Sequence, residues 1–194
     1  MVIYKGNIPM GGQGIEYWDT HIQQNTNNLP DWVKLYERIA KILPTDKNVA
    51  IADFGCQGGY FAEFLHKKGY KNYWGIDFAP STIKMARISV PEFKFTVGNV
   101  YDKKIQDEFP KYDVFIGIQF FHFIKRDLDV INKFPSGKSV ILSVANRSSL
   151  ETVRMFRKVK EVRARYSSVI NIIDVEKVIR PRKRIFYLIY GTKI

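Results

Sequence analysis

The chain has few residues of the kinds that bind metals or cross-link a protein. Its 194 residues include one cysteine, Cys56, and three histidines. A single cysteine excludes a disulfide within the chain and favours a reducing compartment. The histidines, His21, His66 and His122, have no second ligand at a spacing typical of a metal site. The sequence therefore predicts a protein without a metal.

Long apolar runs are also missing. No stretch approaches the length of a membrane span, and residues 1–14 lack the apolar segment of a secretory signal. We therefore expect a cytoplasmic protein that has no membrane partner. A length of 194 residues predicts one domain. We assign it to residues 45–194, with residues 1–44 as an N-terminal arm and cap helices.

Acidic residues are scarce relative to basic ones. The 31 lysines and arginines outnumber the 19 aspartates and glutamates, which gives a formal net charge of +12. Residues 146–194 hold 13 basic and 4 acidic residues and so contribute +9 of this total. Such asymmetry indicates a polyanionic partner. A solvated basic surface is the plainer alternative.

The stretch that organises the chain begins with an apolar run, Val49–Ala52, which ends at an acid, Asp53. Three glycines follow at once: Gly55, Gly58 and Gly59. Glycine permits the positive φ angles of a tight turn and leaves the backbone open to a ligand. Ligands of open α/β sheets bind at this position, beyond the carboxyl end of a strand.

A helix and a second strand complete this unit. Phe61, Phe64 and Leu65 share one side of a helix, and the apolar run Tyr73–Ile76 then ends at Asp77. The order strand, turn, helix, strand predicts a βαβ unit and a parallel sheet. An acid at the end of the second strand can accept hydrogen bonds from two ribose hydroxyls, which predicts a nucleotide-type ligand.

The glycine pattern separates two classes of nucleotide site. A dinucleotide fingerprint that starts at Gly55 requires two further glycines where the chain has Gln57 and Tyr60. This mismatch disfavours a nicotinamide-dependent oxidoreductase. The stretch Asp53–Gly59 instead resembles motif I of the class I S-adenosylmethionine (SAM) methyltransferases. Residues 75–87, GIDFAPSTIKMAR, resemble their motif II region. Gln57 stands where that family usually has its second glycine.

This resemblance covers roughly residues 17–192 and implies a fold and a cofactor. The implied fold is α/β: a Rossmann-like, seven-stranded, mostly parallel sheet with a C-terminal antiparallel hairpin and helices on both faces. The implied cofactor is SAM, with S-adenosylhomocysteine as the product. The residues expected to bind the cofactor are Asp53, Gly55, Cys56, Gly59, Asp77, Phe78, Asn99, Val100 and Gln119.

Three of these residues have specific implied roles. Asp77 should hold the ribose, and Phe78 should pack on the adenine. Asn99 stands where the family usually has an acid that bonds the adenine amino group, and an amide oxygen can accept the same hydrogen bond. Cys56 is disfavoured as a nucleophile, because it lies inside the cofactor turn and has no obvious base beside it.

The rest of the chain alternates strands and helices as a parallel sheet requires. Further strands are predicted at Phe93–Val97, Tyr112–Ile118 and Ser139–Val144. Helices are predicted at residues 15–24, 31–43, 81–89, 103–109, 125–133 and 150–165, the last capped by Ser149. The β-rich runs Ser168–Val178 and Arg184–Tyr190 are too close together for a crossover helix, so they must form an antiparallel hairpin.

The methyl acceptor should lie over the carboxyl ends of the fourth and fifth strands. His122 follows the fourth strand and is the candidate general base, because an ordinary histidine titrates near neutral pH. The alternative is that His122 packs or caps the next helix. The residues expected to bind the acceptor are Tyr17, Trp18, Phe120, Asn146, Arg147 and Arg180; Tyr17, Trp18 and Phe120 have packing roles as alternatives.

Two functions stay open at this point. The first is methyl transfer from SAM to an anionic acceptor, either a small metabolite or RNA. A basic rim beside the acceptor would include Arg147, Arg154, Arg157, Lys158 and the turn 180–183. The second is a catalytically silent relative that binds RNA. The Asp/Asn-Pro-Pro-Tyr/Phe motif of amino-group nucleic-acid methyltransferases is absent after the fourth strand, which argues against methylation of adenine or cytosine amino groups by that type of enzyme.

Overall fold

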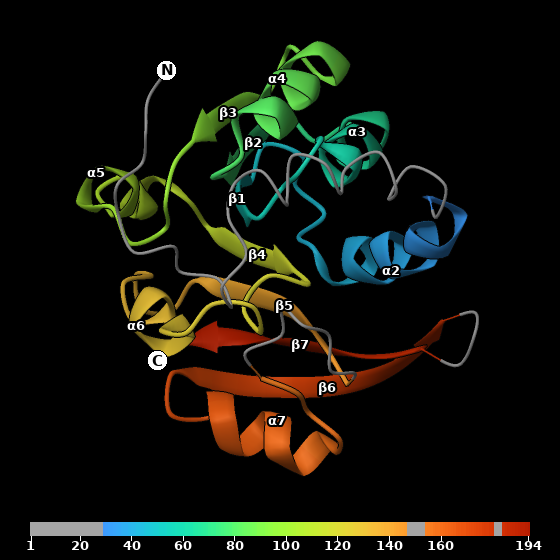
Figure 1. Ribbon diagram of the computed structural model, residues 1–194, viewed down its shortest axis with the longest axis vertical. Coiled ribbons are helices and arrows are strands. Elements are labelled where there is room, and N and C mark those ends of the chain that lie inside the picture. The colour runs from blue at the N-terminus through green and yellow to red at the C-terminus, as the bar shows by residue number, and fades with distance from the viewer. Residues whose placement is uncertain (1–28, 147–153, 181–183) are drawn as a thin grey trace.

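The computed structural model describes residues 29–146, 154–180 and 184–194, and it is drawn in Figure 1. A seven-stranded sheet has the order β3-β2-β1-β4-β5-β7-β6. This architecture confirms the predicted α/β fold with its C-terminal hairpin. The arm and the short helix expected within residues 1–28 lie outside the described residues. The domain boundary at residue 45 stays a prediction.

The strands coincide with the apolar runs of the sequence. β1 to β5 pair in parallel, and β7 runs antiparallel to both β5 and β6. β6 therefore points the same way as β1 to β5, and its carboxyl end lies at the same edge of the sheet. The bounds are β1 (Ala50–Phe54), β2 (Asn72–Asp77), β3 (Lys94–Val97), β4 (Val114–Ile118), β5 (Ser139–Ala145), β6 (Ile170–Arg180) and β7 (Arg184–Lys193).

Helices cover both faces of the sheet. The helices are α2 (Leu29–Ile42), α3 (Tyr60–Lys67), α4 (Pro80–Ser89), α5 (Lys103–Gln106), α6 (Asp127–Ile131) and α7 (Val159–Tyr166), with a 3₁₀ turn at Phe109–Lys111. One apolar cluster includes Leu35, Phe61 and Ile83 from α2, α3 and α4, and the opposite cluster includes Ile105 and Val162 from α5 and α7. β4 is apolar along its length because both of its faces are covered.

One predicted helix is wrong over part of its length. The sequence predicts a helix over residues 150–165, but α7 begins only at Val159 and residues 154–158 are not helical. The Arg154 side chain donates to the carbonyl oxygen of Ile124 at 2.6 Å, and the Phe156 side chain is buried. These tertiary contacts hold the segment extended against the body of the protein. Ser149 and residues 150–153 lie outside the described residues.

Candidate active site

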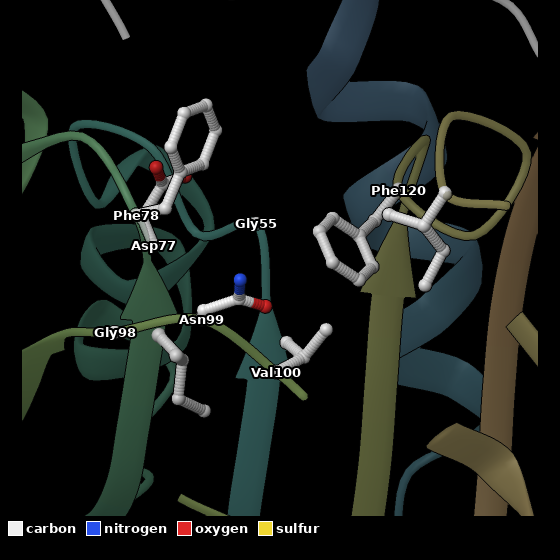
Figure 2. A pocket seen from close by; sticks show the side chains of 9 residues that line it. Gly55, Asp77, Phe78, Gly98, Asn99, Val100 and Phe120 are labelled. Carbon is white, nitrogen blue, oxygen red and sulfur yellow. The ribbon is translucent and has the colours of Figure 1, made fainter. Parts of the chain in front are cut away.

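A pocket opens where four neighbouring strands end, and Figure 2 shows its lining. The empty space at this site is about 290 Å³, which includes the open solvent at the mouth of the pocket. Because neighbouring strands are about 4.8 Å apart, three spacings give the site a width of roughly 14 Å. The pocket therefore suits an elongated ligand. The lining residues are Gly55, Ile76, Asp77, Phe78, Gly98, Asn99, Val100, Phe120 and Ile124.

The turn after β1 brings bare backbone to this pocket. Gly55 has φ +72°, and its N–H donates to the carbonyl oxygen of Ile76 at 2.8 Å. A Cβ atom added to Gly55 would lie 2.6 Å from Cδ2 of Phe120. Any side chain here would therefore clash with the opposite wall, and its positive φ would add strain.

Gln57 keeps the turn although it replaces the usual glycine. It has φ 49°, which lies in the left-handed region that glycine prefers. Its N–H donates to Oδ2 of Asp77 at 3.0 Å. The turn therefore retains a glycine-like conformation, and the hydrogen bond links it to the next strand.

Asp77 presents a fixed carboxylate to the pocket. Oδ2 accepts from Gln57, and Oδ1 accepts from the backbone N–H of Ala79 at 3.0 Å. The backbone of Phe78 and the side chain of Thr82 also donate to this carboxylate. Burial raises the pKa of Asp77 to about 6, although the backbone donors oppose the shift. The group is therefore mostly ionised at pH 7, as an acceptor for two ribose hydroxyls should be.

Asn99 lies in the pocket with its amide orientation fixed. Its Oδ1 accepts the backbone N–H of Tyr101 at 3.0 Å. Only the oxygen of the amide can accept this bond, so the Nδ2 group is turned toward the pocket, as Figure 2 shows. The sequence predicts that the oxygen receives the adenine amino group. The structure instead offers the pocket a donor, which suits a ring nitrogen.

Four of the nine residues expected to bind the cofactor do not line the pocket. The carboxyl group of Asp53 is buried and accepts a hydrogen bond of 2.5 Å from the Tyr73 hydroxyl. Burial raises the pKa of Asp53 to about 7. Gln119 has φ 54°, and its Nε2 donates to Oγ of Ser143 at 2.6 Å, which ties it to β5. Asp53 and Gln119 therefore link the ends of neighbouring strands to one another.

The other two residues, Cys56 and Gly59, belong to the turn after β1 and pack against the elements beside it. The thiol of Cys56 is buried, and its sulfur would lie 2.7 Å from a Cβ atom at Gly75, so it packs against β2. Burial raises the pKa of the thiol, which keeps it protonated. A Cβ atom at Gly59 would lie 3.0 Å from Cβ of Ala86. Gly59 therefore lets α3 and α4 pack closely. Neither Cys56 nor Gly59 lines the pocket, and their contact with the cofactor stays a prediction.

His122 is unsuited to the predicted role of general base. Its side chain is 1% exposed and lies outside the pocket lining. Burial lowers the pKa of His122 to about 3, so the imidazole is neutral and weakly basic at pH 7. Its Nδ1 has no hydrogen-bond partner among the described residues. The packing alternative fits this geometry better.

The remaining acceptor residues are only partly described. Asn146 follows β5, and its N–H donates to the carbonyl oxygen of Ile185 at 3.2 Å. Arg180 ends β6, so its backbone lies at the same edge as the pocket, as predicted. Tyr17, Trp18 and Arg147 lie outside the described residues, and so does the side chain of Arg180.

Sequence reasoning missed three lining residues: Ile76, Gly98 and Ile124. Ile76 and Gly98 directly precede the expected Asp77 and Asn99, so the strand ends already indicated them. Ile124 had no such signal. It reaches the pocket through a loop whose path the sequence does not specify.

Comparison with known proteins agrees with this geometry. Residues 52–134 match the family model described as a methyltransferase domain. This match and the shared fold of the solved structures below support a class I SAM-dependent methyltransferase domain with SAM as its cofactor. No curated protein matches the chain. Within the described residues, no group of three or more His, Cys, Asp or Glu is placed to hold a metal ion, and none of the helices there combines the length and apolar character that crossing a bilayer requires.

Several solved structures share the fold. A putative methyltransferase from Haloferax volcanii, solved in complex with the Trm112 methyltransferase activator, is 14% identical with a TM-score of 0.75; the match covers 92% of this chain and 96% of that one. The N-methyltransferase NodS from Bradyrhizobium japonicum, solved with S-adenosylhomocysteine, is 11% identical with a TM-score of 0.71 and coverages of 92% and 97%. A possible histamine N-methyltransferase from Thermotoga maritima is 15% identical with a TM-score of 0.70 and coverages of 93% and 100%.

Proposed function

We propose that this methyltransferase domain binds SAM in the pocket of Figure 2 and transfers its methyl group to an anionic acceptor. The observation that carries the proposal is that five of the expected cofactor residues line one pocket across neighbouring strand ends. They are Gly55, Asp77, Phe78, Asn99 and Val100. The NodS structure, which shares the fold, was solved with S-adenosylhomocysteine.

The order of the strands gives the order of the contacts. Phe78 and Val100 supply apolar walls for the adenine near the ends of β2 and β3, and Nδ2 of Asn99 donates to its edge. Asp77, at the end of β2, accepts from the ribose. Gly55, at the end of β1, presents backbone without a side chain to the amino-acid part. The sulfur then lies toward β4, where Phe120 stands.

The residues of the pocket act by positioning. SAM supplies a methyl group that is already activated by a positively charged sulfur. Asp77 and the Gly55 turn orient the donor, while Phe120 and Ile124 wall off the β4 side. Correct alignment of two reactants can lower the activation barrier by about 7–11 kcal/mol. Asp77 is the one titratable side chain among the described lining residues, which favours an acceptor that needs no general base.

The acceptor class rests on charge. The basic excess of the chain lies in residues 146–194, and the carboxyl ends of β5 and β6 are at the pocket edge. We therefore propose an acidic metabolite or RNA as the acceptor.

A protein activator like that of the Haloferax neighbour is a candidate partner, so methyl-transfer assays should be run with and without Trm112.

Calorimetric titration with S-adenosylhomocysteine, with NAD as the control ligand, tests the cofactor. We expect micromolar binding of the first and none of the second. Asp77→Ala should weaken binding at least about tenfold because two charge-assisted hydrogen bonds are lost. Asp107→Ala removes a carboxylate that is 57% exposed and directly follows α5, and it should leave binding unchanged. Absence of binding to the parent protein would instead favour the catalytically silent RNA-binding alternative.

A further inference from the structure

Phe120 forms the wall of the pocket at the β4 end. Its ring lies so close to the Gly55 backbone that Cδ2 would be 2.6 Å from a Cβ atom there. Figure 2 shows the ring reaching from the end of β4 toward Gly55. The side chain is 6% exposed and lines the pocket. Phe120 therefore bridges the ends of β1 and β4 beside the open space of the site.

The backbone that carries this ring is held in a strained conformation. Gln119 has φ 54°, a region that costs a residue with a side chain free energy and that concentrates at functional sites. Its N–H donates to the carbonyl oxygen of Ser143 at 2.9 Å, and its side chain donates to Oγ of Ser143. These two bonds fix the turn that directs Phe120 toward Gly55.

The loop after Phe120 is fixed as well. The guanidinium of Arg154 donates to the carbonyl oxygens of Ile124 and Lys125, and its backbone N–H donates to the carbonyl oxygen of His122. Its Nη1 also lies 3.1 Å from Oδ1 of Asp127, which is fully buried. Such anchoring gives the aromatic wall a defined position before any ligand binds.

The position of this wall matters because of where charge lies in the cofactor. Under the proposed function, the sulfur lies beside the Phe120 ring, at the end of the pocket where β1 and β4 meet. The sulfur carries a positive charge in SAM and none in S-adenosylhomocysteine. Asp77 is on β2, on the ribose side, so among the described lining residues no carboxylate lies at this end. The face of an aromatic ring attracts a cation with a free energy that corresponds to about 2- to 30-fold in affinity.

We propose that Phe120 is the residue that distinguishes the charged cofactor from its neutral product, by holding an aromatic ring beside the sulfur. This inference rests on the proposed function. It assigns Phe120 to cofactor selection, whereas the sequence predicts a contact with the acceptor. A preference for SAM helps the product leave after each transfer.

Calorimetry with both ligands tests this assignment. Phe120→Leu keeps an apolar side chain but removes the ring, and we expect it to weaken SAM binding about fivefold while S-adenosylhomocysteine binding changes less than twofold. Phe120→Tyr keeps the ring and should retain the parent ratio. Phe123→Leu, a change in the same loop outside the pocket lining, should also retain it.

Fluorinated phenylalanines at position 120 provide a second measurement that keeps the shape of the side chain. Each added fluorine weakens the negative face of the ring, so SAM affinity should fall stepwise while S-adenosylhomocysteine affinity stays level. Equal losses for both ligands, or no loss for either, would overturn the role of Phe120 and leave the proposed function standing. A parent protein that binds neither ligand would overturn the proposed function itself, and this inference with it.

Discussion

At the scale of single residues, the glycine-rich turn after β1 accommodates Gln57 in place of the usual glycine because a hydrogen bond offsets the strain. A left-handed conformation costs a residue with a side chain about 1–2 kcal/mol. A hydrogen bond to a charged group contributes about 1.5–3 kcal/mol, and the N–H of Gln57 makes such a bond to Asp77. The sequence showed the substitution of glycine by Gln57, but the compensation depends on φ and on a contact with β2, neither of which a motif reports.

Asp53 should make the stability of the protein depend on pH. Its folded pKa of about 7, raised chiefly by burial, lies above the value of about 3.9 expected in the unfolded chain. Its contribution to the free energy of unfolding is therefore complete below pH 4 and is lost as pH rises through 7. We expect the parent protein to lose about 2 kcal/mol between pH 5 and pH 8 through this group, measured by urea denaturation.

Asp53→Asn should remove most of this loss, because the amide oxygen still accepts from Tyr73 and carries no charge to bury. Asp77 titrates in the same direction, with a pKa of about 6, so some pH dependence should persist. Asp46→Asn makes the same chemical change at an exposed residue in the loop before β1 and should behave like the parent. Equal pH dependence in Asp53→Asn and the parent would show that Asp53 does not titrate in this window.

At the scale of elements, strands were predictable and short helices were not. β1, β2 and β4 coincide with apolar runs that end at a polar residue or a glycine, and burial on both faces makes such runs distinctive. The helices expected at residues 103–109 and 125–133 shrink to α5 and α6, of four and five residues. The pocket lining shows the same difference between strands and other segments. The sequence pointed to the lining residues at strand ends. It did not point to Ile124, because Arg154, from a distant segment, holds the loop that carries it.

The buried ion cluster around Asp127 should be essential for joining α6 to α7. Asp127 is fully buried, and its Oδ1 lies 3.1 Å from Nη1 of Arg154 and 2.5 Å from Nη2 of Arg165. Asp127→Asn leaves two partly buried guanidinium groups without their counter-charge. Because breaking a buried pair costs about 3–5 kcal/mol, we expect a loss of about 3 kcal/mol in the free energy of unfolding, measured by urea denaturation.

The matched control lies two residues away. Asp129 is 53% exposed and pairs with Arg126, so Asp129→Asn should cost less than about 1 kcal/mol. Similar losses in both variants would mean that the cluster contributes no more than a surface pair.

At the scale of the whole molecule, the basic C-terminal quarter is less of a continuous rim than the sequence predicts. The Arg154 side chain pairs with the buried Asp127, so its charge is not part of the exposed basic surface. Arg157 and Lys158 are exposed. The carbonyl oxygen of Arg157 accepts from the Tyr187 hydroxyl at 2.7 Å, and the N–H of Phe156 donates to the carbonyl oxygen of Ala145 at the carboxyl end of β5. These contacts bring the pair to the pocket edge.

This placement gives the proposed anionic acceptor a measurable signature. For single strands, each phosphate contact contributes about 0.7 to the slope of log affinity against log salt concentration. If RNA is the acceptor, replacing Arg157 and Lys158 together with serine should reduce that slope by about 1.4, in titrations of a mixed-sequence single strand. Replacing Lys67 and Lys68 with serine removes the same charge at the far end of α3, where the chain returns to the opposite edge of the sheet, and should leave the slope unchanged. Equal slopes in the parent and both variants would mean that this basic pair contacts no phosphate, and the search for the acceptor would then turn to small acidic metabolites.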